Sequence, residues 1–125
     1  MSEIRICNKV WLEIDGQPFL GDGRAILLRT IATTGSINSA CQTLGISYRK
    51  AWAQLREMEQ LAPFLILERC KGGKGGGGAK LTGETLGLLT EFAHLRSLVT
   101  DKMADLQHFD FTFSPRQCLN IKTEE

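Results

Sequence analysis

The feature that most constrains the fold is a pair of helical segments separated by three residues, Gly45, Ile46 and Ser47. The first segment begins at Ser36, and its apolar residues recur at helical spacing. In the connection, the glycine tolerates the positive φ of a tight turn, the isoleucine can enter a core, and Ser47 is a favoured helix N-cap. We therefore predict a helix-turn-helix, with its second helix running from Ser47 to about Gln60.

The residues that precede this motif predict a strand pair and another helix. Residues 4–14 alternate between apolar and polar side chains, which is typical of a half-buried strand. The Asp15-Gly16 turn follows, and residues 17–20 offer a short return strand. We predict that the next helix is capped at its N-terminus by Asp22 and stopped by Gly35.

The residues that follow the motif predict a β-hairpin and a long final helix. Pro63 ends the preceding helix, residues 64–69 have the composition of a strand, and residues 79–81 can return beside it. Such a hairpin after a helix-turn-helix is a wing, and Thr82 can cap the long helix that follows it. The expected fold class is mainly α with a small β wing: a winged helix-turn-helix with a long C-terminal helix.

Positive charge is concentrated in the middle of the chain, although the net charge is only +1. Residues 47–80 contain seven basic and three acidic side chains, whereas residues 81–125 contain four basic and seven acidic ones. For nucleic-acid binding, the distribution of charge matters more than its sum. The basic segment covers the second helix of the motif and the wing.

The helix that enters the major groove in a helix-turn-helix contacts base edges with its N-terminal residues. Here we expect Arg49 or Lys50 to donate to guanine, and Ser47 and Tyr48 to contact phosphate or a thymine methyl group. A solvated helix face is the alternative reading of the same pattern. The complete set predicted to contact DNA is Ser36, Ser47, Tyr48, Arg49, Lys50, Gln54, Arg69, Lys71 and Lys74.

The loop at residues 71–78 combines glycines, which let backbone amides approach phosphates, with lysines, which neutralise them. A flexible linker is the alternative, but a linker needs no regular lysines and seldom joins two strand-like segments. The loop also matches G-x-G-x-x-G, which we discount because a strand, rather than a helix, follows the glycines. We therefore expect the loop to contact the DNA backbone.

Other functional classes have little support. The two histidines, His94 and His108, lack the carboxylate pair, nucleophile or ligand spacing of a catalytic or metal site, and we expect no enzyme activity, no cofactor and no metal. The four cysteines are far apart in sequence, so we expect free thiols. Charges in the first fifteen residues and the lack of an apolar run of about 20 residues predict a cytoplasmic protein without a membrane segment.

Three stretches of the chain carry a more specific pattern: Thr34-Gly35-Ser36-Ile37, Gly45-Ile46-Ser47-Tyr48-Arg49-Lys50-Ala51-Trp52 and Gly72-Gly73-Lys74-Gly75-Gly76-Gly77-Gly78-Ala79-Lys80-Leu81-Thr82. Together they resemble the N-terminal domain of ModE-type molybdate-responsive transcriptional regulators, over about residues 20 to 107. The helix-turn-helix alone is shared more loosely with LysR-type regulators. The resemblance implies homodimerisation through the last helix, with help from the first, and binding of operator DNA through the third helix and the wing.

The last helix also has more apolar surface than a small domain is expected to cover, and its predicted dimerisation residues are Leu88, Phe92, Leu95, Val99 and Leu106. We therefore expect residues 1–107 to form a DNA-binding and dimerisation domain and residues 108–125 to form a tail. That tail is too short for the molybdate-binding domains of full-length regulators, so we expect no molybdate binding in this chain. The expected partners are a second copy and a palindromic duplex operator. A winged-helix protein-interaction module that does not bind DNA is the alternative function.

Overall fold

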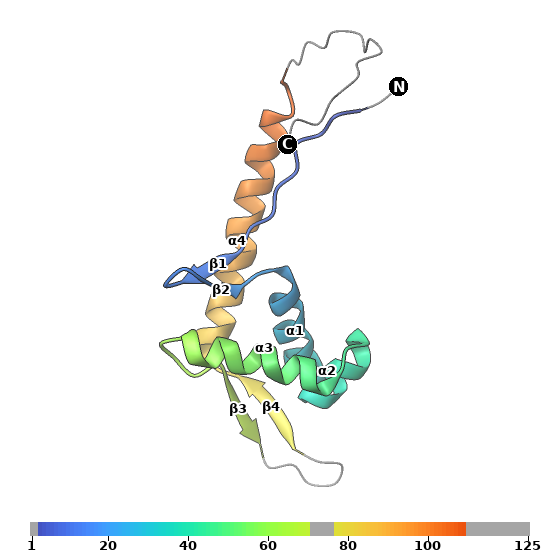
Figure 1. Cartoon of the computed structure of the whole chain (residues 1–125), viewed down its shortest axis with the longest axis vertical. Coiled ribbons are helices and arrows are strands. Elements are labelled where there is room, and N and C mark those ends of the chain that lie inside the picture. The colour runs from blue at the N-terminus through green and yellow to red at the C-terminus, as the bar shows by residue number, and fades with distance from the viewer. Residues whose placement is uncertain (1–2, 71–76, 110–125) are drawn as a thin grey trace, which may run out of the picture.

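A computed structural model describes residues 3–70 and 77–109 of the chain. In chain order, its elements are β1 (Leu12–Ile14), β2 (Gln17–Leu20), α1 (Asp22–Thr34), α2 (Ile37–Leu44), α3 (Tyr48–Leu61), β3 (Leu67–Cys70), β4 (Gly78–Leu81) and α4 (Gly83–Leu106). Helices α1, α2 and α3 form a cluster, from which the β3–β4 hairpin and α4 extend in opposite directions (Figure 1). The predicted winged helix-turn-helix with a long last helix is therefore confirmed.

Three hydroxyl side chains cap the helices as the sequence predicts. Ser36, Ser47 and Thr82 each accept a hydrogen bond from the backbone N–H three residues further on. Each such cap typically stabilises a helix by about 1 kcal/mol. Gly35 and Gly45 end α1 and α2 with φ values of 85° and 69°, which favour glycine. Local sequence chemistry thus sets the boundaries of the helix-turn-helix.

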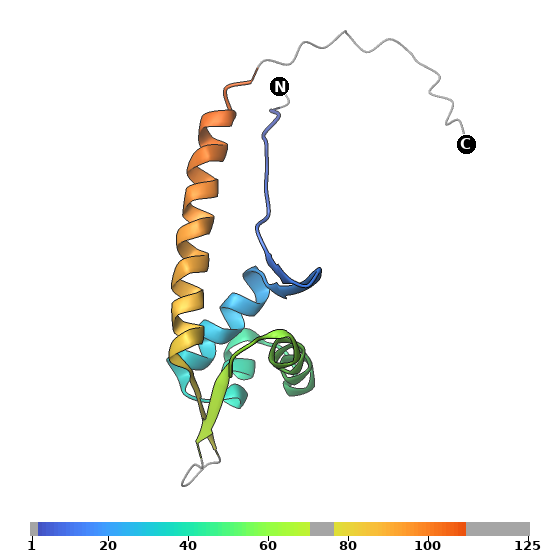
Figure 2. The same cartoon turned by 90° about the vertical axis from the view of Figure 1, so that its left-hand side faces the viewer.

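The first predicted strand is shorter in the structure than in the sequence analysis. Within residues 4–14, only Leu12–Ile14 pairs with β2. The partner strand has four residues and ends at Leu20, where Gly21 already caps α1, so the ladder cannot continue beyond the Leu12–Leu20 pair. Residues 3–11, which we call the N-terminal arm, instead run extended beside α4 (Figure 2). The alternating pattern predicted the extended backbone correctly but not the extent of pairing.

Two other element boundaries differ from the predictions. Gly21, rather than Asp22, is the N-cap of α1, and it provides no side-chain cap. Asp22 lies in the first helical turn, where a negative charge interacts favourably with the helix dipole. Strand β3 begins at Leu67 rather than at residue 64.

The hydrophobic core joins the three-helix cluster to the base of the wing. Leu28 of α1, Leu55 of α3 and Phe92 of α4 are almost completely buried together. Beside them, the buried hydroxyl of Thr85 donates to the backbone carbonyl of Ile66 over 2.7 Å. This bond fixes the start of α4 to the segment that leads into β3.

Candidate nucleic-acid interface

The first turn of α3 presents polar and basic side chains on a firmly packed helix. Tyr48, Arg49 and Lys50 are exposed, and Tyr48 retains 47% of its accessible surface. The hydroxyl of Ser47 accepts a hydrogen bond from the Lys50 N–H over 3.0 Å. The opposite face of the helix is anchored in the core by a completely buried set, Ala51, Leu55 and Met58. The turn therefore has the exposure and rigidity that a major-groove contact needs.

The turn between α2 and α3 is held by backbone and side-chain hydrogen bonds. Ile46 donates its backbone N–H to the carbonyl of Cys41 over 3.1 Å. The Cys41 thiol lies within sulfur hydrogen-bond range of the Ser47 carbonyl, at 3.9 Å, and burial raises the pKa of this thiol. At the start of α2, the half-buried Ser36 uses its hydroxyl oxygen to cap the Ser39 N–H over 2.9 Å. Its O–H proton can still be donated to another acceptor.

The wing is attached to the end of α1 as well as to α4. The Ala79 N–H of β4 donates to the carbonyl of Gly35 over 2.8 Å. At the preceding residue, Gly78, a Cβ atom would lie only 3.0 Å from the same carbonyl oxygen. The approach of the two backbones is therefore too close for a side chain without a local shift. Glycine at this position is explained by docking of the wing, in addition to any effect on DNA binding.

Arg69 of β3 connects the wing to α3 through an aromatic ring. Its guanidinium carbon lies 4.2 Å from the centroid of the Trp52 ring, which is cation–π distance. Tyr48 makes an edge-on contact with Trp52, with 6.1 Å between the ring centroids and an interplanar angle of 68°. Trp52 is half-buried, and its ring contacts two predicted DNA-binding residues, Tyr48 and Arg69. The i, i+4 spacing of Tyr48 and Trp52 was the available sequence signal.

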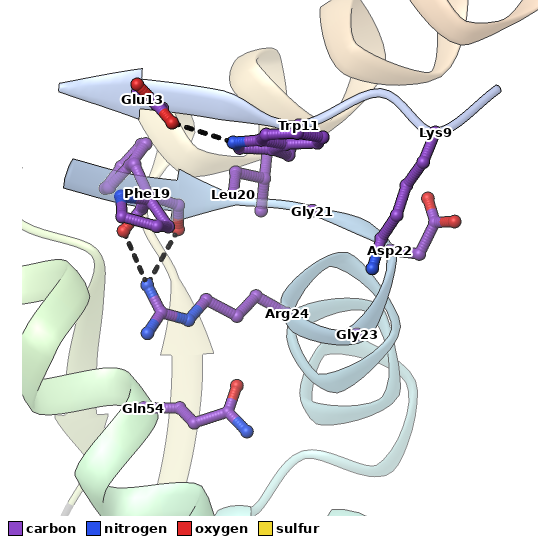
Figure 3. Close-up of a pocket in the computed structure, with 11 residues that line it drawn as sticks. Lys9, Trp11, Glu13, Phe19, Leu20, Gly21, Asp22, Gly23, Arg24 and Gln54 are labelled. Atoms are coloured by element: carbon purple, nitrogen blue, oxygen red, sulfur yellow. Dashed lines mark hydrogen bonds between the residues drawn. The ribbon is translucent and has the colours of Figure 1, made fainter. Parts of the chain in front are cut away.

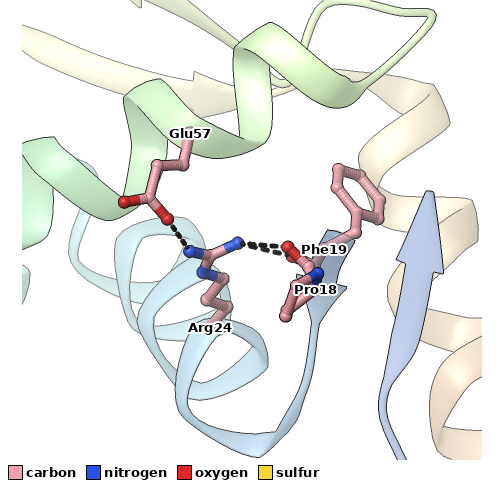
Figure 4. A network of polar contacts seen from close by, with 4 residues as sticks. All are labelled: Pro18, Phe19, Arg24 and Glu57. Carbon is pink, nitrogen blue, oxygen red and sulfur yellow. Dashed lines mark hydrogen bonds and ion pairs between the residues drawn. The ribbon is translucent and has the colours of Figure 1, made fainter. Parts of the chain in front are cut away.

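Arg24 links three elements behind the interface (Figure 4). Its guanidinium donates to the backbone carbonyls of Pro18 and Phe19 over 3.2 and 3.1 Å, and it forms an ion pair with Glu57. These contacts join β2, α1 and α3, so they restrain the angle at which α3 is presented. No sequence signal identified the pairing of Arg24 with Glu57, because the two residues are 33 positions apart in the chain.

Gln54 lies one turn beyond the basic first turn of α3 and is half-buried. It lines a hollow of about 600 Å³ together with Trp11, Arg24 and the start of α1 (Figure 3). The indole N–H of Trp11 donates to Glu13 over 2.9 Å at the rim. Gln54 therefore lies beside this hollow, whereas Tyr48, Arg49 and Lys50 of the first turn are exposed.

The remaining predicted contacts are the two lysines of the wing loop, Lys71 and Lys74, and both lie outside the described residues. The described strands flank that loop in regular antiparallel register, with Glu68 opposite Lys80 and Arg69 opposite Ala79.

The predicted dimerisation residues do not share one environment. Phe92 is only 1% exposed and belongs to the core of its own chain. Leu88 and Val99 are half-buried, whereas Leu95 and Leu106 retain 40% and 48% of their accessible surface. The second half of α4 therefore presents apolar side chains that the described part of the chain leaves uncovered.

Metal-binding clusters and membrane-spanning helices are both absent from the described residues. Among residues 3–70 and 77–109, no cluster of three or more His, Cys, Asp or Glu side chains could hold a metal ion. Within the same ranges, no helix is both long and apolar enough to cross a membrane.

The fold and this exposed basic turn define a winged helix-turn-helix protein. No protein-family model matches the chain. It is nevertheless 45% identical over 71 residues to the "DNA-binding transcriptional dual regulator ModE" of Escherichia coli, a match that covers 57% of this chain and 27% of the relative. The "Molybdenum transport protein ModE" of Azotobacter vinelandii is 38% identical over 82 residues, covering 66% of this chain and 30% of the relative. These matches confirm the resemblance to ModE-type regulators.

A third relative is matched over more of this chain. The "Molybdenum-pterin-binding protein MopA" of Rhodobacter capsulatus is 30% identical over 107 residues, which cover 86% of this chain and 40% of the relative. The matches thus span less than half the length of each of these three relatives.

Proposed function

We propose that this protein is a dimeric, sequence-specific DNA-binding transcriptional regulator. The observation that carries the proposal is the first turn of α3, where Tyr48, Arg49 and Lys50 are exposed on a helix whose other face is buried. A helix with this arrangement in a helix-turn-helix can enter the major groove without moving the core. The ModE relatives named as DNA-binding or transcriptional regulators support the same function.

Each side chain of this turn has a chemically suitable DNA partner. Arg49 or Lys50 donates to O6 and N7 of guanine, which is the commonest specific contact in the major groove. Ser47 and Tyr48 contact phosphate or a thymine methyl group, and the N–H groups at the start of α3 favour a nearby phosphate. Lys71 and Lys74 of the wing loop neutralise further phosphates.

The dimer forms through the exposed apolar side of α4. Four apolar residues on this side form a stripe along α4: Leu88, Leu95, Val99 and Leu106. Their positions are symmetric about residue 97, because Leu95 and Val99 each lie two residues from it and Leu88 and Leu106 each lie nine residues from it. Two antiparallel copies that cross at the level of Ser97, through the opposite face that carries the stripe, therefore place Leu95 against the partner's Val99 and Leu88 against the partner's Leu106.

The first helix contributes a smaller part of the dimer contact. Ile26 of α1 retains 49% of its accessible surface, and burial of such a side chain stabilises an interface. Residues 1–107 then form one DNA-binding and dimerisation domain. A two-fold dimer would place two α3 helices about 34 Å apart, or a multiple of that distance, so the operator is a palindrome with matching half-site spacing.

The target genes proposed for this regulator serve molybdenum uptake or use. The support is that relatives from Herbaspirillum seropedicae and Azotobacter vinelandii are named molybdenum transport proteins.

Selection of bound duplexes from a random DNA library tests the proposal. We expect enrichment of one palindromic sequence by the wild-type protein. A variant in which the basic pair of α3 is replaced, Arg49→Ala together with Lys50→Ala, should give no such enrichment. Failure of the wild-type protein to enrich or retain any duplex would contradict the proposed function and would favour a protein-interaction module.

A further inference from the structure

Trp52 has the largest side chain of α3, and its ring contacts Arg69 of strand β3. The Trp52 ring is only half-buried, and the guanidinium carbon of the exposed Arg69 lies 4.2 Å from its centroid. The exposed Tyr48 ring also contacts it, edge-on. The three residues form a stack that runs from the first turn of α3 to strand β3. We call it the Tyr48–Trp52–Arg69 stack.

Stacking fixes a guanidinium without using its hydrogen-bond donors. All five N–H groups of arginine lie in the plane of the guanidinium, whereas a cation–π contact uses the face of that plane. An arginine held over an indole therefore has its orientation restricted while its edge remains able to bind a phosphate. The compact ammonium group of lysine cannot be oriented in this way.

The charges around the stack favour an anion as its ligand. In the described part of the chain, the two ion pairs join Arg24 to Glu57 and Arg96 to Asp22, and neither involves Arg69. Arg69 contacts Trp52 on the helix whose first turn carries Arg49 and Lys50, so the two elements that the stack joins both carry exposed cations. A bound phosphate relieves the repulsion between these cations.

We propose that Trp52 is a positioning residue for DNA binding, which presents the edge of Arg69 and the hydroxyl of Tyr48 together to the phosphate backbone. This inference rests on the proposed function. It adds a connection between α3 and the wing, because the Trp52 ring sets the position of β3 against α3. The backbone hydrogen bond from Ala79 to Gly35 attaches the other strand of the wing, β4, to the end of α1. Base reading by α3 and backbone contact by the wing are then parts of one rigid unit.

Comparison of arginine with lysine at position 69 tests the stack because the charge is retained. Arg69→Lys should weaken binding to the selected operator by about twofold to fivefold per subunit, through loss of the stacked geometry. The matched control is Arg5→Lys in the exposed N-terminal arm, which should bind like the wild type.

Comparing arginine with lysine at position 69 in variants of Trp52 shows whether the loss of DNA affinity acts through the Trp52 ring. In a Trp52→Leu background, arginine and lysine at position 69 should bind equally well, because no ring remains to orient the guanidinium. Trp52→Phe retains a weaker aromatic face, so the preference for arginine should be reduced but still measurable there, even if Trp52→Leu does not fold. An equal cost of Arg69→Lys in every folded background, or no cost in the wild type, would overturn the inference.

Fluorescence of the free protein separates failure of the stack from failure of DNA binding. With Trp11→Phe as the background, Trp52 is the single remaining indole of the chain. Arg69→Lys should change its emission before any DNA is added, because the cation leaves the ring face. Unchanged emission would show that the stack is absent in solution. A changed emission without DNA binding by the wild type would instead contradict the proposed function, and with it the role assigned to Trp52.

Discussion

The side-chain amide of Gln107 forms two hydrogen bonds with the main chain of Ile6, a residue 101 positions earlier in the sequence. Its Oε1 accepts from the Ile6 N–H over 3.1 Å, and its Nε2 donates to the Ile6 carbonyl over 2.8 Å. A primary amide can satisfy a backbone N–H and C=O at the same residue in the way that a neighbouring strand does. The end of α4 therefore holds the N-terminal arm in place.

Gln107→Ala should free the N-terminal arm without unfolding the domain. Backbone amides of residues 5–10 should exchange with solvent about fivefold to thirtyfold faster, because two partly buried hydrogen bonds are lost. The melting temperature should remain close to that of the wild type, since the core is not touched. Gln42→Ala, on the exposed surface of α2, is the control and should leave the exchange of the arm unchanged. Unchanged exchange in Gln107→Ala would show that the two bonds do not hold the arm.

Thr85→Val should destabilise the junction between α4 and the wing. The substitution nearly preserves the shape of the side chain but removes the completely buried hydroxyl that donates to the Ile66 carbonyl. We expect the free energy of unfolding to fall by about 1–3 kcal/mol, measured by urea denaturation. Thr90→Val removes an exposed hydroxyl on the same helix and should change it by less than about 0.5 kcal/mol. Equal effects of the two substitutions would contradict this account of the junction.

Arg49→Ala and Lys74→Ala should weaken DNA binding in different ways. Loss of a base contact at Arg49 should cost about 1–3 kcal/mol on the operator and relax the preference at one base pair. Loss of a phosphate contact at Lys74 should weaken binding to all sequences alike and reduce the salt slope by about one unit. Competition binding on operator and scrambled duplexes at several salt concentrations distinguishes these patterns. Binding by both variants that matches the wild type would refute the assignment of the site.

Leu95→Glu should convert the proposed dimer into monomers. Leu95 lies at the centre of the exposed stripe of α4, where a buried carboxylate without a partner would be costly. Leu86→Glu is the matched control, because Leu86 has similar exposure but lies on the opposite side of the same helix. Light scattering should report a monomer mass for the first variant and a dimer mass for the second. A dimer mass for Leu95→Glu would show that another surface forms the contact.

Cys41 should react with an alkylating reagent more slowly than the exposed Cys7 and Cys70. Burial raises the pKa of Cys41, so at any pH near neutrality a smaller fraction of this thiol is the reactive thiolate. The rate at Cys41 should therefore begin to rise at a higher pH than the rates at the exposed thiols, as measured by mass spectrometry of the alkylated peptides. Similar rates at all three positions would contradict the packing around the turn before α3.

The sequence predicts helix boundaries well where local chemistry decides them. The caps Ser36, Ser47 and Thr82 and the helix-ending glycines, Gly35 and Gly45, lie where propensity and backbone geometry require them. The exposed first turn of α3 also follows from the apolar spacing of its opposite face. These features depend on neighbours within a few residues, so periodicity and capping rules suffice.

The features that the sequence does not predict depend on contacts between distant segments. Strand β1 is short because its partner is short, and the N-terminal arm is held by a glutamine at the other end of the described chain. The stack of Arg69 on Trp52 also brings together two elements that no local pattern relates. Phe92 shares helical periodicity with Leu95, but core packing buries the first and leaves the second partly exposed.

The affinity of the wild-type protein for its selected duplex and for a scrambled duplex, across a range of salt concentrations, tests the central claim most directly. We predict at least about a thousandfold preference for the selected duplex. The affinity should also fall steeply as salt rises, because several phosphates are contacted at once. Equal, weak binding to both duplexes, or binding that does not respond to salt, would contradict the assignment of this fold as a DNA-reading domain.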